Sequence, residues 1–157
     1  MPNPTFTYNV GIASPRSIRL DAAVETRLAS YVARHPGLSS SSVAARLVDE
    51  GLRMDEHPGV AFREGPIGRR ATLVGGPDVW EVIHAAKSAR TAEPDLSEGD
   101  LLELVAANSG LPARLVRAAV AYWAAYPEEI EVLLEHTARV TSGALAAHER
   151  TVRLLAR

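Results

Sequence analysis

Hydrophobic and polar residues follow two different periods between residues 17 and 54. A short segment alternates, which places Ile18 and Leu20 on one face and Ser17 and Arg19 on the other. Two stretches with the 3.6-residue period of an amphipathic helix follow, and a Pro-Gly pair separates them. The pattern therefore predicts a strand, a helix, a turn and a second helix.

The residues that flank these stretches predict where each helix begins. Asp21 is a good N-cap for the first helix, and Glu25 in its first turn complements the helix dipole. Ser39 is the expected cap of the second helix, whose first backbone amides are suited to bind an anion. The predicted apolar stripes consist of Val24, Leu28, Tyr31 and Val32 in the first helix, and Val43, Leu47, Val48 and Leu52 in the second.

A strand of four residues cannot satisfy its backbone hydrogen bonds alone, so pairing with the same strand of a second copy is expected. The two strands would then present Ser17 and Arg19 on one ribbon. Such a ribbon fits the major groove of DNA, where arginine can pair with guanine through two hydrogen bonds and a hydroxyl can contact either base type. A plain helical hairpin with a serine cap is the simpler interpretation of the same residues.

Residues 55–59 (DEHPG) have the composition of a linker, and a hairpin signal follows around Gly65-Pro66 and Gly68. Three arginines in this hairpin, Arg63, Arg69 and Arg70, are candidates for a basic wing that contacts DNA or a partner; a solvated turn is the alternative. A helix is predicted from Pro77 and Asp78, with Val79, Val82, Ile83 and Ala86 on one face. The polar stretch 88–99 is predicted to be a loop, and Ser97 to start the next helix with Asp100 as its capping partner.

Residues 102–121 have the spacing of a helix-turn-helix. Ala106 allows two helices to cross closely, Gly110 supplies a positive φ at the turn, and Val116 fills the angle between them. Arg114 and Arg117 then share the outer face of the second helix, from which they can reach phosphates or bases. A packing unit with incidental arginines is the alternative.

A long helix is predicted from Pro127 onward, with acidic residues at its start and arginines at its end. Gly143 is the position where this helix is expected to bend most easily. We expect the apolar side to pack on another copy, on the rest of the chain, or in the groove of a partner protein. That side carries Ile130, Leu133, Leu134, Thr137, Val140, Thr141, Ala144 and Leu145.

Composition narrows the function classes. The 157 residues have a net charge of -2, so DNA contact would depend on local basic patches. The chain has no cysteine and its five histidines lack paired ligand spacing, so neither a metal site nor a cofactor is expected. No nucleophile-base pair or phosphate-binding glycine loop indicates catalysis, so we expect no enzyme and no catalytic residue. No membrane span or signal pattern is recognised, which predicts a cytoplasmic protein without membrane contact.

The first third of the chain resembles the ribbon-helix-helix family of bacterial repressors and antitoxins, through the run IRLD and the run GLSSSSVAARLVDEGL. The resemblance implies a homodimer whose paired strands enter the major groove of double-stranded DNA. By position, Ser17 and Arg19 would face bases, and Arg16 is a further candidate for a base or flank contact. Pro15 and Arg16 depart from the family's alternating pattern, so the register of the strand at Arg16 is open. The resemblance implies a phosphate clamp at Ser39, Ser40 and Ser41.

Residues 57–130 resemble a bacterial domain of helix-turn-helix character found in antitoxin-like proteins. The segments that carry this likeness are HPGVAFREGPIGRRATL, GGPDVWEVI and LVAANSGLPARLVRAAVAYWAAYPEEI. Some members of such families are encoded beside PIN-type ribonuclease toxins, so the resemblance implies a toxin of that type as a partner. Arg69, Arg70, Arg114 and Arg117 form the candidate second DNA contact.

Together these observations predict a mainly α protein. Its expected parts are an N-terminal arm (1–14), a ribbon-helix-helix dimerisation and DNA-binding module (15–55), a β-hairpin and helix-turn-helix-like domain (56–127) and a C-terminal helix (128–157). The predicted function is that of a sequence-specific transcriptional regulator, an antitoxin or autorepressor. The alternatives are a plasmid partition or copy-control protein with the same DNA chemistry, and a toxin-neutralising protein that does not read a specific DNA sequence.

Overall fold

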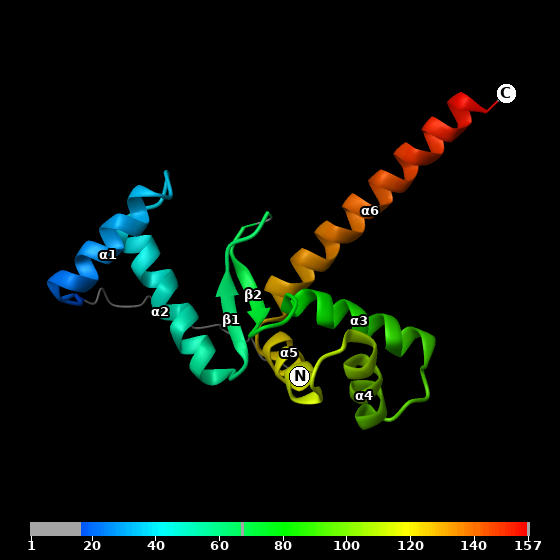
Figure 1. Ribbon diagram of the computed structural model, residues 1–157, viewed down its shortest axis with the longest axis horizontal. Coiled ribbons are helices and arrows are strands. Elements are labelled where there is room, and N and C mark those ends of the chain that lie inside the picture. Colours follow the sequence, from blue (N-terminus) through cyan, green and yellow to red (C-terminus); the bar gives the residue numbers. More distant parts are fainter. Residues whose placement is uncertain (1–16, 67, 157) are drawn as a thin grey trace, which may run out of the picture. The chain divides into compact units, whose positions relative to one another are not determined.

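The computed structural model describes residues 17–66 and 68–156, and over these residues the protein is mainly helical with one two-stranded antiparallel sheet (Figure 1). Clustering of contacts gives two compact units, the first ending at Ala45 and the second beginning at Arg46. In chain order the elements are α1 (Ala22–Ala33), α2 (Ser40–Glu56), β1 (Val60–Arg63), β2 (Arg70–Leu73), α3 (Val79–Ala92), α4 (Glu98–Ser109), α5 (Ala113–Ala125) and α6 (Pro127–Leu155).

The segment predicted to be a strand has no regular secondary structure in the single chain. Residues 17–20 form neither helix nor strand, and all four side chains are exposed. Because a strand exists only through its pairing, the ribbon stays a prediction about two copies. The predicted arm (1–14), Pro15 and Arg16 lie outside the described residues.

The second half of α2 belongs to the second compact unit, so the predicted linker at 55–59 does not separate two independent bodies. The helix ends at Glu56, and a tight turn connects it to β1 through a hydrogen bond from the Val60 N–H to the His57 carbonyl, 3.0 Å. Gly59 has a φ of +103° in this turn, which only glycine adopts readily. Its carbonyl accepts a hydrogen bond from the Val74 N–H at 2.9 Å.

The predicted hairpin is confirmed. β1 and β2 pair antiparallel, with Val60 opposite Leu73 and Arg63 opposite Arg70. The inner face of this small sheet packs on the helices of the second unit and forms its hydrophobic core. The buried core residues are Val60, Ala71, Leu73, Val79, Val82, Ile83, Val105, Ala106, Leu115, Val116, Ala119, Tyr122 and Ile130.

The helix that begins after Asp78 is longer than the sequence predicted. Residues 88–92, which were expected to start a loop, form the last turn of α3. Ala89 on this turn packs against the core, and no helix-breaking residue occurs before Pro94. The Arg90 guanidinium then donates to the Leu96 carbonyl at 2.6 Å, which fixes the short connection that follows.

The local features predicted for residues 102–121 are confirmed. Gly110 has a φ of +66° at the end of α4, and Ala106 and Val116 are buried where α4 and α5 pack. The start of α4 also follows the prediction, since the Asp100 N–H donates to Ser97 Oγ at 3.2 Å. The two helices therefore meet through small and β-branched residues across a glycine turn.

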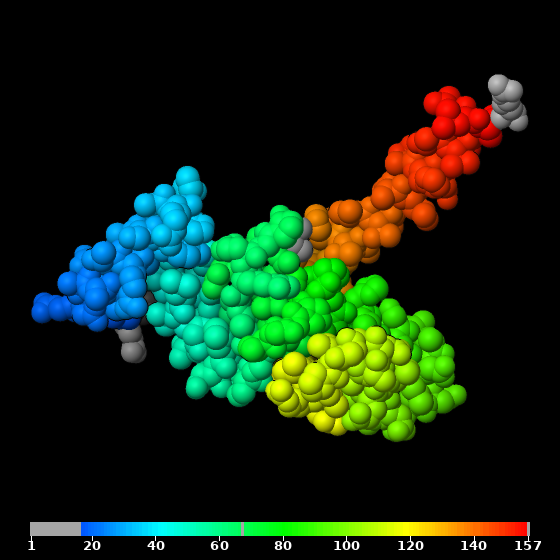
Figure 2. Space-filling model, viewed as in Figure 1, coloured from blue at the N-terminus to red at the C-terminus, as the bar shows by residue number. Residues whose placement is uncertain are grey.

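The terminal helix α6 begins with Pro127 at a first-turn position, as predicted, and continues through Gly143 to Leu155. Its first turns are held to the second unit by the buried Ile130 and by Glu131, which accepts hydrogen bonds from Lys87 Nζ (2.6 Å) and Trp123 Nε1 (2.8 Å). The C-terminal part of the helix, beyond Thr141, is almost entirely exposed and projects from the rest of this unit (Figure 2). The predicted apolar side is therefore buried only over its first part.

Candidate nucleic-acid interface

The segment that carries the predicted base contacts leads directly into α1. Ser17 and Arg19 are exposed, and no described residue pairs with the Arg19 guanidinium. Ile18, which lies between them in the sequence, is 71% exposed, and Leu20, which follows Arg19, is 39% exposed. The segment thus offers apolar side chains without cover and polar side chains without partners.

The end of this segment is fixed by the cap of α1. Asp21 has an extended backbone, its Oδ1 accepts a hydrogen bond from the Val24 N–H at 2.8 Å, and its carbonyl accepts one from the Glu25 N–H at 2.9 Å. The predicted N-cap is therefore confirmed. Because the cap defines where the helix begins, it also defines where the non-helical residues 17–20 end.

The start of α2 is a reciprocal serine cap. Ser39 Oγ accepts from the Ser42 N–H at 3.1 Å, and Ser42 Oγ in turn accepts from the Ser39 N–H at 3.1 Å. This confirms Ser39 as the cap. The N–H groups of Ser40 and Ser41 have no acceptor among the described residues, and both side chains are exposed. Two amides at the positive end of a 17-residue helix are therefore available to an anion.

The helices of this region expose much of their predicted apolar surface. α1 has no buried residue, and the four positions of its stripe are only half-buried. On α2, Val43 is buried, but Leu47, Val48 and Leu52 are 38%, 54% and 59% exposed. A helix of 12 residues without a buried side chain has little to stabilise it in a single chain, because most helical stability in proteins comes from packing.

The two arginines predicted on the outer face of α5 are exposed there. Arg117 makes a surface ion pair with Glu103 on α4, at 3.4 Å, whereas Arg114 has no partner among the described residues. The first turn of α4 adds Glu98 and Asp100 to the same helix pair. The outer face of this helix pair therefore carries charges of both signs.

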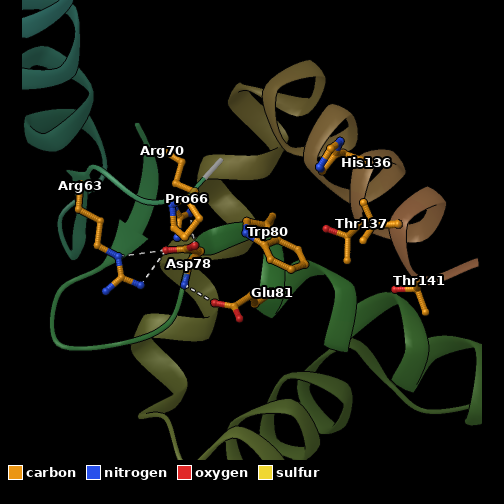
Figure 3. A pocket seen from close by; sticks show the side chains of 10 residues that line it. Arg63, Pro66, Arg70, Asp78, Trp80, Glu81, His136, Thr137 and Thr141 are labelled. Carbon is orange, nitrogen blue, oxygen red and sulfur yellow. Dashed lines mark hydrogen bonds and ion pairs between the residues drawn. The ribbon is translucent and has the colours of Figure 1, made fainter. Parts of the chain in front are cut away.

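The hairpin arginines are held by carboxylates within the second unit. Arg69 makes a two-pronged ion pair with Glu50 on α2, with its Nη2 2.7 Å from Oε2. Arg63 Nη2 lies 2.9 Å from Asp78 Oδ1, and Arg70 Nε donates to Asp78 Oδ2 (Figure 3). These contacts favour a structural role for Arg69 and Arg70 over the DNA contact predicted for them.

Asp78 is the centre of this arrangement because it also caps α3. Its backbone N–H donates to Glu81 Oε2 at 2.8 Å, and its side chain is almost fully buried. Burial by itself would raise the pKa of the Asp78 carboxyl, but the hydrogen bonds from Arg70 and Arg63 outweigh it and hold this pKa below its usual value. Asp78 therefore joins the hairpin and α3 as a charged group.

A second polar centre, which was not predicted from the sequence, surrounds Arg53 on α2. Arg53 Nη1 donates to Tyr122 Oη at 3.1 Å and to Glu129 Oε2 at 2.8 Å, and the guanidinium lies 4.1 Å from the centre of the Tyr126 ring. Burial raises the pKa of the Tyr122 hydroxyl well above its usual value, against the opposing effect of Arg53. Tyr122 therefore stays protonated and donates to Glu129.

A cavity of about 380 Å³ lies between the hairpin, the start of α3 and one side of α6 (Figure 3). Trp80 lines it, and the indole N–H of Trp80 is buried without a hydrogen-bond partner among the described residues. The other lining residues are Arg63, Pro66, Arg70, Asp78, Glu81, His136, Thr137, Val140 and Thr141. The part of the chain that the structure describes has no cluster of three potential metal ligands.

Comparisons with protein-family models, with curated proteins and with solved structures found no match to this chain. Among the described residues, no helix has the length and apolar character needed to cross a membrane.

Proposed function

We propose that the protein is a sequence-specific DNA-binding regulator that acts as a homodimer through paired N-terminal strands, in the manner of the ribbon-helix-helix family. The observation that carries this proposal is the exposed segment 17–20, in which apolar and polar side chains alternate immediately before a capped helix. Within this function we propose autorepression of an antitoxin operon, with a ribonuclease toxin as the protein partner, on the resemblance of residues 57–130 to antitoxin-like proteins.

The need for a second copy follows from what the single chain leaves uncovered. Ile18 and Leu20 are exposed, and α1 has no buried residue. Pairing segment 17–20 with its equivalent would satisfy backbone groups along two strands and cover one apolar face of the ribbon. Burial of an apolar side chain contributes about 1.5–3 kcal/mol, so a few such residues from each copy would offset the cost of association.

In such a ribbon the opposite face carries Ser17 and Arg19, because successive side chains alternate across a strand. An arginine that is free of internal ion pairs keeps its fork of N–H donors for a base, and guanine offers two acceptors at the matching spacing in the major groove. Serine can donate to or accept from either base type. Segment 17–20 therefore has the residue types needed for base recognition.

The start of α2 supplies what a phosphate requires. Ser40 and Ser41 present backbone N–H groups at a helix N-terminus, and the reciprocal cap between Ser39 and Ser42 keeps those groups in place. Phosphate contacts fix the position of a protein on the duplex without reading sequence. The proposal thus assigns positioning to α2 and sequence recognition to segment 17–20.

The proposal is tested by the substitution Arg19→Ala. Binding to the upstream region of the gene and to a shuffled duplex would be measured by fluorescence anisotropy at one fixed salt concentration. If Arg19 holds a base through two hydrogen bonds, the upstream region should bind more weakly by about 1–3 kcal/mol, and binding to the shuffled duplex should change little.

Arg34→Ala is the matched control, since Arg34 is an exposed arginine just after α1 that lacks a carboxylate partner among the described residues. It removes the same charge outside the proposed ribbon. The proposal is wrong if Arg19→Ala binds the upstream region as well as the unsubstituted protein does. It is equally wrong if the two variants lose the same affinity on both duplexes.

A further inference from the structure

The exposed part of α6 has a regular apolar stripe. From Leu134 onward the positions on one face are separated alternately by four and three residues, which is the spacing of a coiled-coil seam. After Leu134 the stripe consists of the apolar residues Ala138, Leu145, Val152 and Leu155 and the polar residues Thr141 and His148. The side chains on the opposite arc include Arg139, Gly143 and Arg150.

The same face of the helix is covered at its start and uncovered beyond it. Ile130 is fully buried and Leu134 is half-buried against the core, whereas Leu145, Val152 and Leu155 are 62%, 52% and 75% exposed. Helices that lack tertiary packing are marginal in water when they are shorter than about 12–15 residues, and a longer one still exposes its apolar side. We therefore expect a partner that buries the exposed side chains of the stripe.

We propose that this partner is α6 of a second copy, packed antiparallel. The charged side chains beside the stripe favour the antiparallel orientation of the two helices. Glu135 and Arg153 lie nine residues before and after Ala144. Neither of these two side chains has an ion-pair partner among the described residues.

In an antiparallel pair that crosses near Ala144, Glu135 of each copy lies level with the other copy's Arg153. The positions are 18 residues apart, or five full turns, so the two side chains share one edge of the stripe. A parallel pair would instead face this charged edge with the opposite edge of the partner's stripe, so Glu135 and Arg153 would not meet. The antiparallel arrangement also places the acidic first part of one helix beside the basic end of the other.

The same crossing places apolar positions together. Leu145 lies within two residues of the level of Thr141 of the other copy, and Val152 within two residues of the level of Leu134, so the exposed end of each helix covers the half-buried start of the other. This contact is independent of the proposed DNA function and of segment 17–20.

The orientation is tested with single cysteines, because the chain has none of its own. An affinity-tagged Ala138→Cys variant and an untagged His148→Cys variant of the full chain would be mixed in a glutathione redox buffer. Antiparallel pairing near Ala144 brings these two positions within two residues, or about 3 Å, of the same level on facing sides, so a mixed disulfide should exceed the Ala138→Cys homodimer. Gly143→Cys, on the opposite arc, measures cross-linking by collision.

A predominant Ala138→Cys homodimer would indicate parallel helices and overturn the proposal. Cross-linking no greater than that of Gly143→Cys would overturn it as well. Leu145→Glu in both cysteine variants should reduce the mixed disulfide more than roughly tenfold, since it buries a charge in the stripe. Gly143→Glu should leave the amount of mixed disulfide unchanged. Circular dichroism should show equal helix content for the Leu145→Glu and Gly143→Glu variants.

Discussion

The substitution Asp78→Asn tests whether the junction between the hairpin and α3 depends on charge. Asp78 accepts hydrogen bonds from Arg63 Nη2 at 2.9 Å and from Arg70 Nε, and its side chain is 3% exposed. Asparagine keeps the shape and one acceptor oxygen but removes the negative charge. Two guanidinium groups would then share a neutral partner.

The expected cost follows from the burial of each arginine. The Arg70 side chain is 12% exposed and cannot readily replace its partner with water, whereas Arg63 is 52% exposed and can. Removing one partner of a fully buried pair costs about 3–5 kcal/mol, while an exposed pair contributes about 0–1 kcal/mol. With the remaining acceptor of asparagine taken into account, we expect the second unit to lose about 2–3 kcal/mol of unfolding free energy.

The loss should also depend on pH. Because the pKa of Asp78 is lower in the folded protein than its usual value near 3.8, the carboxylate stabilises the fold fully above that value. This stabilisation is lost as the pH falls through the lowered pKa. The difference between the unsubstituted protein and Asp78→Asn should therefore be constant near neutral pH and shrink in acid below about pH 4.

Urea unfolding followed by tryptophan fluorescence measures this difference, because both tryptophans, Trp80 and Trp123, lie in the second unit. Asp95→Asn is the control: Asp95 is exposed and has no hydrogen-bond partner among the described residues. A loss smaller than about 0.5 kcal/mol for Asp78→Asn would refute the reasoning. A loss of the expected size that does not shrink in acid would show that the shape of the side chain, rather than its charge, is what matters.

Three further substitutions test other parts of the structure. Gly110→Ala should destabilise the second unit by about 1–2 kcal/mol in the same urea experiment, because Gly110 has a φ of +66°. An added Cβ would meet no atom within 4 Å, so the loss would measure backbone strain alone. Tyr122→Phe removes a buried hydroxyl that donates to Glu129 and should cost about 1–2 kcal/mol; equal stability would mean that the hydroxyl contributes no net free energy. The pair Arg114→Gln and Arg117→Gln should leave the salt dependence of DNA binding unchanged, whereas a slope reduced by about 0.9 per lost phosphate contact would place α5 on DNA.

The features that the sequence predicted correctly depend on neighbouring residues. Asp21 and Ser39 cap their helices through contacts over three residues, and Gly110 has the positive φ expected of it. The alternation of apolar residues around Gly65 and Gly68 was sufficient to predict the hairpin. Each of these outcomes is decided within one turn of chain, so periodicity and residue type are enough to predict it.

The features that the sequence did not predict depend on residues far apart in the chain. Arg53 meets Tyr122 and Glu129, which are 69 and 76 residues away, and no local pattern indicates such a contact. The hairpin arginines were expected to be free for the same reason, since the pairing of Arg69 with Glu50 is set by how α2 packs beside the hairpin. The strand at 17–20 is a further case, because its pairing would require atoms of a second chain.

The distribution of these ion pairs changes what the net charge of -2 means for DNA binding. In the second unit Arg53, Arg69 and Arg70 are each matched by a carboxylate within the fold, so that region contributes little positive field to its surroundings. In the first unit, Arg19 has no carboxylate partner among the described residues, and the backbone amides of Ser40 and Ser41 have no acceptor there. Electrostatic attraction to DNA depends on local potential rather than on net charge, and salt screens contributions from beyond about 10 Å. The proposed DNA contact through the N-terminal region is therefore compatible with a slightly acidic chain, and with few phosphate contacts its affinity would depend only weakly on salt.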